Sequence, residues 1–307
     1  MKVWLLVNYE IFGENNMQHK FYVKDIPDLF STWQWIKQNT DIVQLASGMT
    51  PSVDATHLIN LKHSFDINKL ATATMDSLDR FGFYGWRTDT SDANDYGGMS
   101  LAYNPDYIED CNPNQQTLGT SKNNNNEFFY GQVGKFKSIR NSYFDTYAFR
   151  HYPPCVSETG LCDFLDGFKR SAVRGRVAVI NSEFVPEEKR DAFGWHKDET
   201  VFENLRINIP IKTDNTYMFQ LKGQQPEHLV YGNMYSWDTF LPHRVFPTTT
   251  NPTRRVHLVL GFSPWFDYIK EEDAWISNEF FGVMHPIDML VNGHIHESIN
   301  GLNISSL

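Results

Sequence analysis

Apolar and polar residues alternate in short runs along the second half of this 307-residue chain. In the run LRINIPI, residues 205–211, the odd-numbered positions are all apolar, whereas the even-numbered positions include Arg206 and Asn208. Successive side chains of a strand point to opposite faces, so this run predicts a strand with one apolar and one polar face. The run RVHLVL, residues 255–260, repeats the design with Arg255 on its polar face.

Short runs of this kind follow one another between residues 175 and 262, with turn residues between them and no helical pattern among them. Such a succession is typical of a β-sandwich or a β-barrel. The candidate strands are GRVAVINSEF, GWHKD, NLRINIPIKT, TYMFQLKG, HLVYGNMYSW, PHRVF and RRVHLVLGF.

Residues 1–126 have a mixed pattern that includes a first strand in MKVWLLVNYE. Apolar residues recur at helical spacing near residues 26–38 and 66–80, and we expect these helices to cover the apolar face of the sheet. The stretch from about residue 88 to residue 126 is dense in Asp, Asn, Gly and Pro. It predicts a long loop or lid whose Asn run forms a flexible tip.

These patterns predict a mainly β fold with flanking helices in one structural domain. We expect residues 1–126 to form a mixed α/β region packed on the core, and residues 127–266 to form the β core itself. A short helix is expected within residues 158–171. Residues 267–307 return to a helical and loop pattern and are expected to form a C-terminal extension.

The composition is that of a globular protein, with 41% hydrophobic residues and a formal net charge of −10. The negative charge argues against a general nucleic-acid binder, which needs a basic surface to displace counterions from phosphates. No run of about 18 apolar residues is present, and the first apolar stretch is too short for a signal-peptide core. Three cysteines are too few for a disulfide framework at this size. We therefore expect a cytoplasmic protein without membrane or nucleic-acid partners.

Metal-binding residue types occur at strand spacing in GWHKDE, where His196 and Asp198 share one face if the segment is extended. His243 follows in LPHRV. Polar groups that converge inside a barrel cost kilocalories each unless something satisfies them, and a metal ion would do so. Two imidazoles and one carboxylate form the facial triad that holds Fe(II) and leaves positions open for a cosubstrate and O₂.

Two arginines complete this hypothesis. A planar guanidinium pairs with a carboxylate through two parallel hydrogen bonds, so Arg206 and Arg255 could hold the two ends of a dicarboxylic acid whose keto acid end chelates the metal. Arg254 competes with Arg255 for this role. The alternation places Arg254 on the opposite face, where an arginine at a strand end usually reaches solvent, and therefore favours Arg255.

The motifs H-x-D, R-x-N, W-D-x-x-x-P-H and R-x-H-L-V-L occur in this order within about residues 174–262. This part of the chain resembles the aspartyl/asparaginyl β-hydroxylase family of Fe(II)/2-oxoglutarate-dependent dioxygenases, which includes proline hydroxylase-like members. The resemblance implies a double-stranded β-helix core of the jelly-roll, cupin-like type. It also implies iron ligation by His196, Asp198 and His243.

The same resemblance implies how the cosubstrate is bound. Arg255 would bind the distal carboxylate of 2-oxoglutarate, and Arg206 would contact the cosubstrate near the metal. Asn208 stands where the family usually has His, and the gap between His243 and Arg255 is slightly longer than expected. Oxidative decarboxylation of 2-oxoglutarate to succinate and CO₂ would be coupled to oxidation of a substrate C–H bond by O₂.

The sequence leaves the substrate, the reaction outcome and the oligomeric state open. One hypothesis is hydroxylation of an amino acid, free or within a peptide. A second is an oxygenase that hydroxylates, desaturates or cyclises another kind of small molecule. A third is a non-catalytic jelly-roll binding protein, because a fold does not fix a function. Three intact metal-ligand positions and two well-placed arginines argue against the third.

A second group of metal-binding residues lies in the tail HPIDMLVNGHIHESIN. His294 and His296 share a face if this segment is extended, and His285 and Asp288 lie nearby in the sequence. The Asn-Gly pair before His294 indicates a turn, so a solvated loop is the simpler interpretation.

Overall fold

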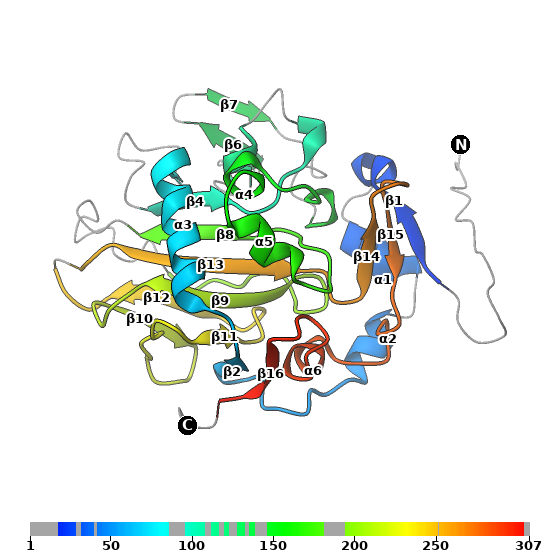
Figure 1. Cartoon of the computed structure of the whole chain (residues 1–307). Helices are drawn as coiled ribbons and strands as arrows, with labels where there is room; N and C mark the ends of the chain where they lie inside the picture. Colours follow the sequence, from blue (N-terminus) through cyan, green and yellow to red (C-terminus); the bar gives the residue numbers. More distant parts are fainter. Residues whose placement is uncertain are drawn as a thin grey trace.

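A large antiparallel sheet forms the centre of the computed structural model (Figure 1). In sheet order its strands are β16 (Ile299–Leu302), β2 (Ile59–His63), β11 (Met234–Ser236), β9 (Leu205–Lys212), β13 (Arg255–Phe262), β8 (Arg176–Ile180), β4 (Tyr96–Ser100) and β3 (Tyr84–Gly85). The residues that the structure describes are 18–28, 32–39, 42–85, 96–107, 112–116, 120–122, 128–132, 135–138, 146–180, 194–250 and 252–303.

Three smaller antiparallel sheets accompany the main sheet. One pairs β10 (Tyr217–Leu221) with β12 (His243–Pro247), and its register places Leu221 opposite His243. The other two are β1 (Lys20–Tyr22), β15 (Ala274–Ser277) and β14 (Phe266–Ile269), and β5 (Thr120–Lys122), β6 (Phe128–Gln132) and β7 (Lys135–Ser138).

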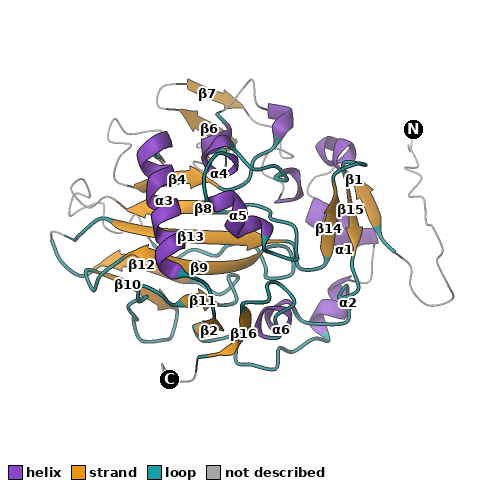
Figure 2. Ribbon diagram, in the orientation of Figure 1, coloured by secondary structure: helices purple, strands orange, loops and turns teal. Residues whose placement is uncertain are grey.

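Helices occupy the periphery, as the colouring by secondary structure makes clear (Figure 2). The α-helices are α1 (Thr32–Asn39), α2 (Ile42–Ser47), α3 (Ile67–Phe81), α4 (Pro154–Ser157), α5 (Leu161–Asp166) and α6 (Pro286–Val291). Short 3-10 helices are η1 (Val23–Asp28), η2 (Pro105–Tyr107), η3 (Pro113–Gln115) and η5 (Thr146–Ala148). Within the described residues, no helix is both long and apolar enough to cross a membrane.

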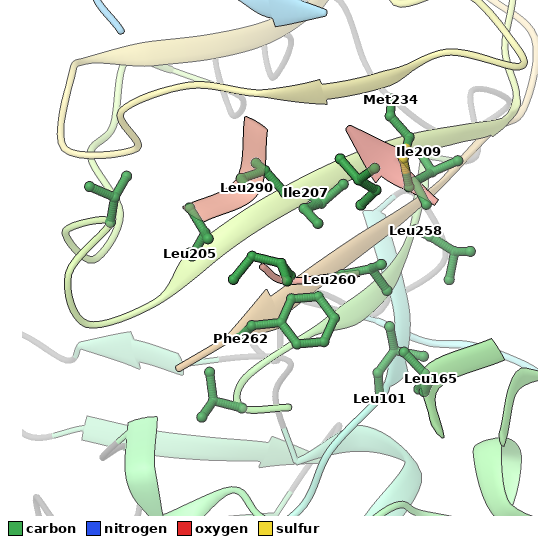
Figure 3. Packing of buried hydrophobic residues seen from close by; sticks show 14 of the residues in the cluster. Leu101, Leu165, Leu205, Ile207, Ile209, Met234, Leu258, Leu260, Phe262 and Leu290 are labelled. Carbon is green, nitrogen blue, oxygen red and sulfur yellow. The ribbon is translucent and has the colours of Figure 1, made fainter. Parts of the chain in front are cut away.

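One face of the main sheet packs against helices. Helix α3 contacts β9 and also packs on α4 and α5. Figure 3 shows Ile207 and Ile209 of β9 beside Leu258 and Leu260 of β13, and all four side chains are fully or almost fully buried. The alternation in the two strand sequences therefore predicted this apolar face correctly.

Helix α3 has clear sequence determinants at both ends. The Asp66 side chain accepts a hydrogen bond from the Lys69 backbone N–H, 3.0 Å, which satisfies one free donor of the first turn. The helix ends at Gly82, whose positive φ of 72° glycine adopts more readily than other residues. Its buried face includes Leu70 and Leu78. The prediction of a helix near residues 66–80 is confirmed.

The opposite face of the main sheet packs against the β10–β12 sheet. Tyr235 of β11 belongs to a second apolar cluster with Phe219, Leu221, Leu229 and Trp237. Tyr235 is also the register partner of Asn208, so both lie on the face that looks toward β10 and β12. The polar face predicted for β9 and β13 is therefore buried between two sheets.

Three expectations about the periphery were wrong. The stretch expected to be a long loop contains β4, which pairs with β8 inside the main sheet. The helix expected near residues 26–38 consists of η1 and α1, and Figure 1 shows α1 to one side of the main sheet and not across it. In GWHKD, only His196 has strand pairing, as a single bridge to His243.

The main sheet also draws on all three expected regions of the chain, since β2, β3 and β4 precede residue 127 and β16 follows residue 267. The strand expected in MKVWLLVNYE and the Asn run at 123–126 lie outside the described residues.

Candidate metal centre

Two imidazoles and one carboxylate meet beside the first residue of β12. One candidate ligand atom from each of His196, Asp198 and His243 lies within 4.8 Å of the other two. His243 Nε2 is 3.6 Å from Asp198 Oδ2, and the two imidazole centroids are 4.4 Å apart. Among the described residues, this is the one group of three or more His, Cys, Asp or Glu side chains close enough to hold a metal ion.

Backbone pairing brings these three residues together. The His196 N–H donates to the His243 carbonyl at 3.0 Å, and the His243 N–H donates to the His196 carbonyl at 2.9 Å. Directly opposed residues of an antiparallel pair project their side chains on the same face. The Asp198 N–H donates to the Thr239 carbonyl, 3.0 Å, and this bond holds the segment where Asp198 Oδ2 lies 3.6 Å from His243 Nε2.

Each imidazole is held in one tautomer by a backbone carbonyl. His196 Nδ1 lies 2.9 Å from the Gly194 oxygen, and His243 Nδ1 lies 2.9 Å from the Leu241 oxygen. A carbonyl oxygen can only accept, so Nδ1 carries the hydrogen in both rings. The lone pair is therefore on Nε2 in both rings, which is the arrangement of a metal-binding histidine whose other nitrogen is anchored.

The charge states of His196 and Asp198 also suit a cation. His196 touches solvent, yet desolvation within the site, with His243 beside it, lowers its pKa and favours the neutral ring. Burial alone would raise the pKa of Asp198, but the Arg206 guanidinium and His243 hold it well below its usual range. The neutral His196 ring and the ionised Asp198 carboxylate are the forms that bind a metal ion.

The Arg206 guanidinium bonds to two carboxylates beside the candidate centre. One terminal nitrogen, Nη1, donates to Asp198 Oδ2, and the other, Nη2, donates to Glu199 Oε2. The second oxygen of Glu199 accepts from Arg174 Nη1 at 2.9 Å. A chain of alternating charges therefore runs from Arg174 to the candidate metal ligand.

Arg255 lies on the face of β13 that looks toward β10. Its Nη2 donates to His257 Nδ1 at 2.9 Å, and the residue is 7% exposed. Arg254 lies on the other face, where its guanidinium is 5.3 Å from the centroid of Phe83, the residue just beyond α3. The strand register thus separates the two arginines in the way the alternation predicted.

Two further buried polar groups accompany Arg255. Burial and the Arg255 charge keep the pKa of His257 well below its ordinary value, so the ring is neutral and its Nε2 carries the hydrogen. Burial raises the pKa of Tyr217 to about 12, which Arg255 partly opposes. Among the described residues, neither His257 Nε2 nor the Tyr217 hydroxyl has a hydrogen-bond partner. These are the kind of buried polar atoms that a ligand satisfies.

Asn208 and Trp237 lie close to the candidate ligands. Asn208 is buried on β9, opposite Val259 in the β13 register, on the same strand face as Arg206. Trp237 is also buried, and its ring centroid is 5.4 Å from that of His243, so it forms part of the wall of the site.

The histidines of the tail have other roles. His285 Nδ1 accepts from the Ile287 N–H and caps α6, and His296 Nδ1 accepts from the Ser298 N–H. Asp288 accepts from the backbone and hydroxyl of Ser52. This segment forms α6 and β16, so the expectation of a simple solvated loop was wrong, although Gly293, with φ of 76°, does form the expected turn.

Sequence reasoning missed Glu199, Arg174 and Arg176. The positive charge of Arg176 contributes to lowering the pKa values of both His196 and Asp198. The alternation in residues 176–180 could have predicted the direction of Arg176. Val177 and Val179 belong to the apolar core under the helices, so Arg176 lies on the opposite strand face with respect to Val177, toward the site. The pairing of Glu199 with two arginines has no such local signal.

Comparisons with known proteins assign no family to this chain. No protein-family model matches this chain, and no curated protein matches its sequence.

Proposed function

We propose that this protein is an Fe(II)- and 2-oxoglutarate-dependent oxygenase that hydroxylates an amino acid, free or within a peptide or protein. The observation that carries the proposal is the convergence of His196, Asp198 and His243, with both Nδ1 atoms anchored on carbonyls. Two imidazoles and one carboxylate are the donor set of the facial triad, which suits non-haem Fe(II). Bound iron, with O₂ and 2-oxoglutarate, supplies the oxidising chemistry.

The buried groups around Arg255 support the cosubstrate part of the proposal. The Arg255 guanidinium, the Tyr217 hydroxyl and His257 Nε2 are donors in a region shielded from water. A carboxylate there would accept charge-assisted hydrogen bonds, which are stronger than neutral ones. Arg255 therefore anchors the distal carboxylate, while Asn208 and Arg206 lie on the adjacent strand. A contact between Arg206 and the cosubstrate stays a prediction.

The arrangement of the sheets supports a double-stranded β-helix core. Strands β9 and β13 face β10 and β12, and the candidate metal and cosubstrate residues lie on the inward faces. Trp237 and Phe219 pack against His243, with ring centroids 5.4 Å and 6.1 Å from it. These aromatic rings exclude water from one side of the metal position while His196 stays open to solvent.

A substrate screen with two readouts tests this function. Iron-loaded protein is incubated with isotope-labelled 2-oxoglutarate and panels of free amino acids and peptides, and labelled succinate and product mass are measured. We expect one class of substrate to raise succinate formation and to gain one oxygen atom. Iron-loaded protein that forms no more succinate than a His243→Ala variant, and oxidises no member of either panel, would contradict the proposal.

A further inference from the structure

One half-buried carboxylate, that of Glu199, lies beside the candidate metal centre and has no role in the chemistry proposed above. The side chain of Glu199 is 17% exposed, and each of its oxygens pairs with a different arginine, Arg206 and Arg174. Its backbone carbonyl also accepts a hydrogen bond from the Thr239 hydroxyl. Glu199 is thus fixed at both its backbone and its side chain.

The arginine next to Glu199 is shared. Arg206 is 5% exposed, and its second terminal nitrogen donates to Asp198. A buried guanidinium needs a counter-charge, because removing one partner from a buried ion pair leaves an uncompensated charge. With Glu199 present, Arg206 keeps one carboxylate of its own even when Asp198 directs its negative charge toward a cation.

Without Glu199, pairing with Arg206 and binding of a metal ion would compete for the Asp198 carboxylate. Arg206 would lose one of the two carboxylates it bonds to, so its pairing with Asp198 would tighten and a metal ion would have to compete with a buried guanidinium for Asp198. The cation would also approach that guanidinium with less negative charge nearby, which is repulsive at short range. Both effects weaken metal binding.

We propose that Glu199 is a positioning residue for the metal centre: it holds Arg206 so that Asp198 is oriented for the metal and remains available to it. This inference rests on the proposed function, because it presumes a metal at His196, Asp198 and His243. Groups that hydrogen-bond to metal-ligating side chains commonly change metal affinity by about 10- to 100-fold when they are removed. Arg174 acts one step further away, by fixing the second oxygen of Glu199.

Calorimetric titration with Co(II) alone, as a spectroscopic substitute for Fe(II), tests the inference on the full chain. Glu199→Gln should weaken Co(II) binding about 10- to 100-fold and shift the visible absorption of the bound ion. Glu199→Asp keeps the charge and should lose less affinity. The matched control is Glu203→Gln, in the same segment but bonded to Thr146, which should bind Co(II) within about twofold of the parent.

Unchanged Co(II) affinity and absorption in both Glu199 variants would overturn the inference. A purely structural Glu199 would lower the melting temperature and leave these two properties of the folded protein unchanged. If Glu199→Gln does not fold, the Co(II) affinity of Glu199→Asp tests the inference alone. A Co(II) affinity equal to that of the parent would then overturn it. The Asp198→Asn variant separates the proposed function from the proposed role of Glu199. If the parent binds Co(II), Asp198→Asn does not bind it, and Glu199→Gln binds it as the parent does, then only the role of Glu199 is contradicted. If the parent binds no metal, the metal site and the role of Glu199 are both contradicted.

Discussion

The hydrogen bond between His196 and the Gly194 carbonyl decides which ring nitrogen is available to a ligand, and His243 repeats it with Leu241. In each case the acceptor is the carbonyl two residues earlier, so the tautomer is fixed by the local extended backbone. A side chain whose tautomer and ring orientation are set before binding needs less reorganisation when a metal arrives. The two histidines therefore make the candidate centre preorganised for a metal.

The two adjacent arginines at the start of β13 give a direct prediction. Arg255→Ala should raise the KM for 2-oxoglutarate at least about a hundredfold, because losing two charge-assisted hydrogen bonds costs about 3 kcal/mol. Arg254→Ala is the matched control and should change this KM little, since Arg254 lies over Phe83 on the other face. Equal effects of the two substitutions, measured by succinate formation at varied cosubstrate, would contradict the proposed anchor.

Asp198 leads to a prediction about the product. With a carboxylate as third protein ligand, chloride has no vacated metal position beside the reacting centre, so hydroxylation should prevail even in excess chloride. Mass spectrometry of the product, once a substrate is known, should show a gain of one oxygen atom. A chlorine isotope pattern in the product of the parent protein would be incompatible with Asp198 as a ligand, and a loss of two hydrogens would indicate desaturation.

Helix α3 packs directly on the main sheet through β9. Leu78, 3% exposed, belongs to the core shared by α3, β9 and β13. Leu78→Ala should lower the free energy of unfolding by about 2–5 kcal/mol, since it removes buried methyl groups and leaves a cavity. Lys69→Ala, at an exposed position of the same helix, should change it by about 0.5 kcal/mol or less. Chemical denaturation checks both, and similar losses would show that α3 is not anchored through Leu78.

The sequence was informative about elements where one face is buried. The alternation in 205–211 and 255–260 predicted both strands and their faces, and the helical spacing near residue 70 predicted α3. It failed for β4, because the segment YGGMS is rich in glycine and has no alternation to detect. That strand exists because β8 offers a free edge next to it, which depends on tertiary pairing and not on local pattern.

On the scale of the whole molecule, one buried arginine joins three distant segments. The Arg150 side chain, 3% exposed, donates to both oxygens of Asp273, to Asn104 Oδ1 and to the Ala148 carbonyl. Asp273 has φ of 46° in the turn between β14 and β15, a conformation that Asp and Asn adopt more readily than most residues. This network ties the β14–β15 hairpin to the segments that follow β4 and η5.

The network gives the protein a pH-dependent term in stability. Burial alone would raise the pKa of Asp273, but hydrogen bonds from Arg150 and Tyr268 lower it below its ordinary value. The stabilisation is therefore complete above the pKa that Asp273 has in the unfolded chain, about 3.9. It is lost as the pH falls through the lower pKa that Asp273 has in the folded protein. Asp273→Asn should be less stable than the parent at pH 5–7, with a difference that shrinks below about pH 4.

Thermal unfolding across pH measures this difference. Glu271→Gln, an exposed change in the same turn, is the control and should follow the parent at every pH. A difference between Asp273→Asn and the parent that grows as the pH falls would contradict the role given to Asp273.

The candidate site shows how far sequence reasoning reaches across the molecule. His196, Asp198 and His243 could be grouped because residue type and strand spacing are both local features. The pairing of Arg206 with Glu199 could not be predicted from the sequence, because it depends on how the segment after His196 is placed relative to β9. The contact expected between Arg206 and the cosubstrate stays a prediction, and the structure adds that both terminal nitrogens of Arg206 bond to carboxylates.

Metal stoichiometry decides whether His196, Asp198 and His243 form a metal site. Protein purified without oxygen is titrated with Fe(II) in a calorimeter, alongside His243→Ala. The matched control is His294→Ala, because the His294 ring packs on Phe280 in the tail. We expect one Fe(II) per chain for the parent and the control, and a large loss of affinity for His243→Ala. Iron binding that survives His243→Ala and disappears in His294→Ala would contradict this expectation.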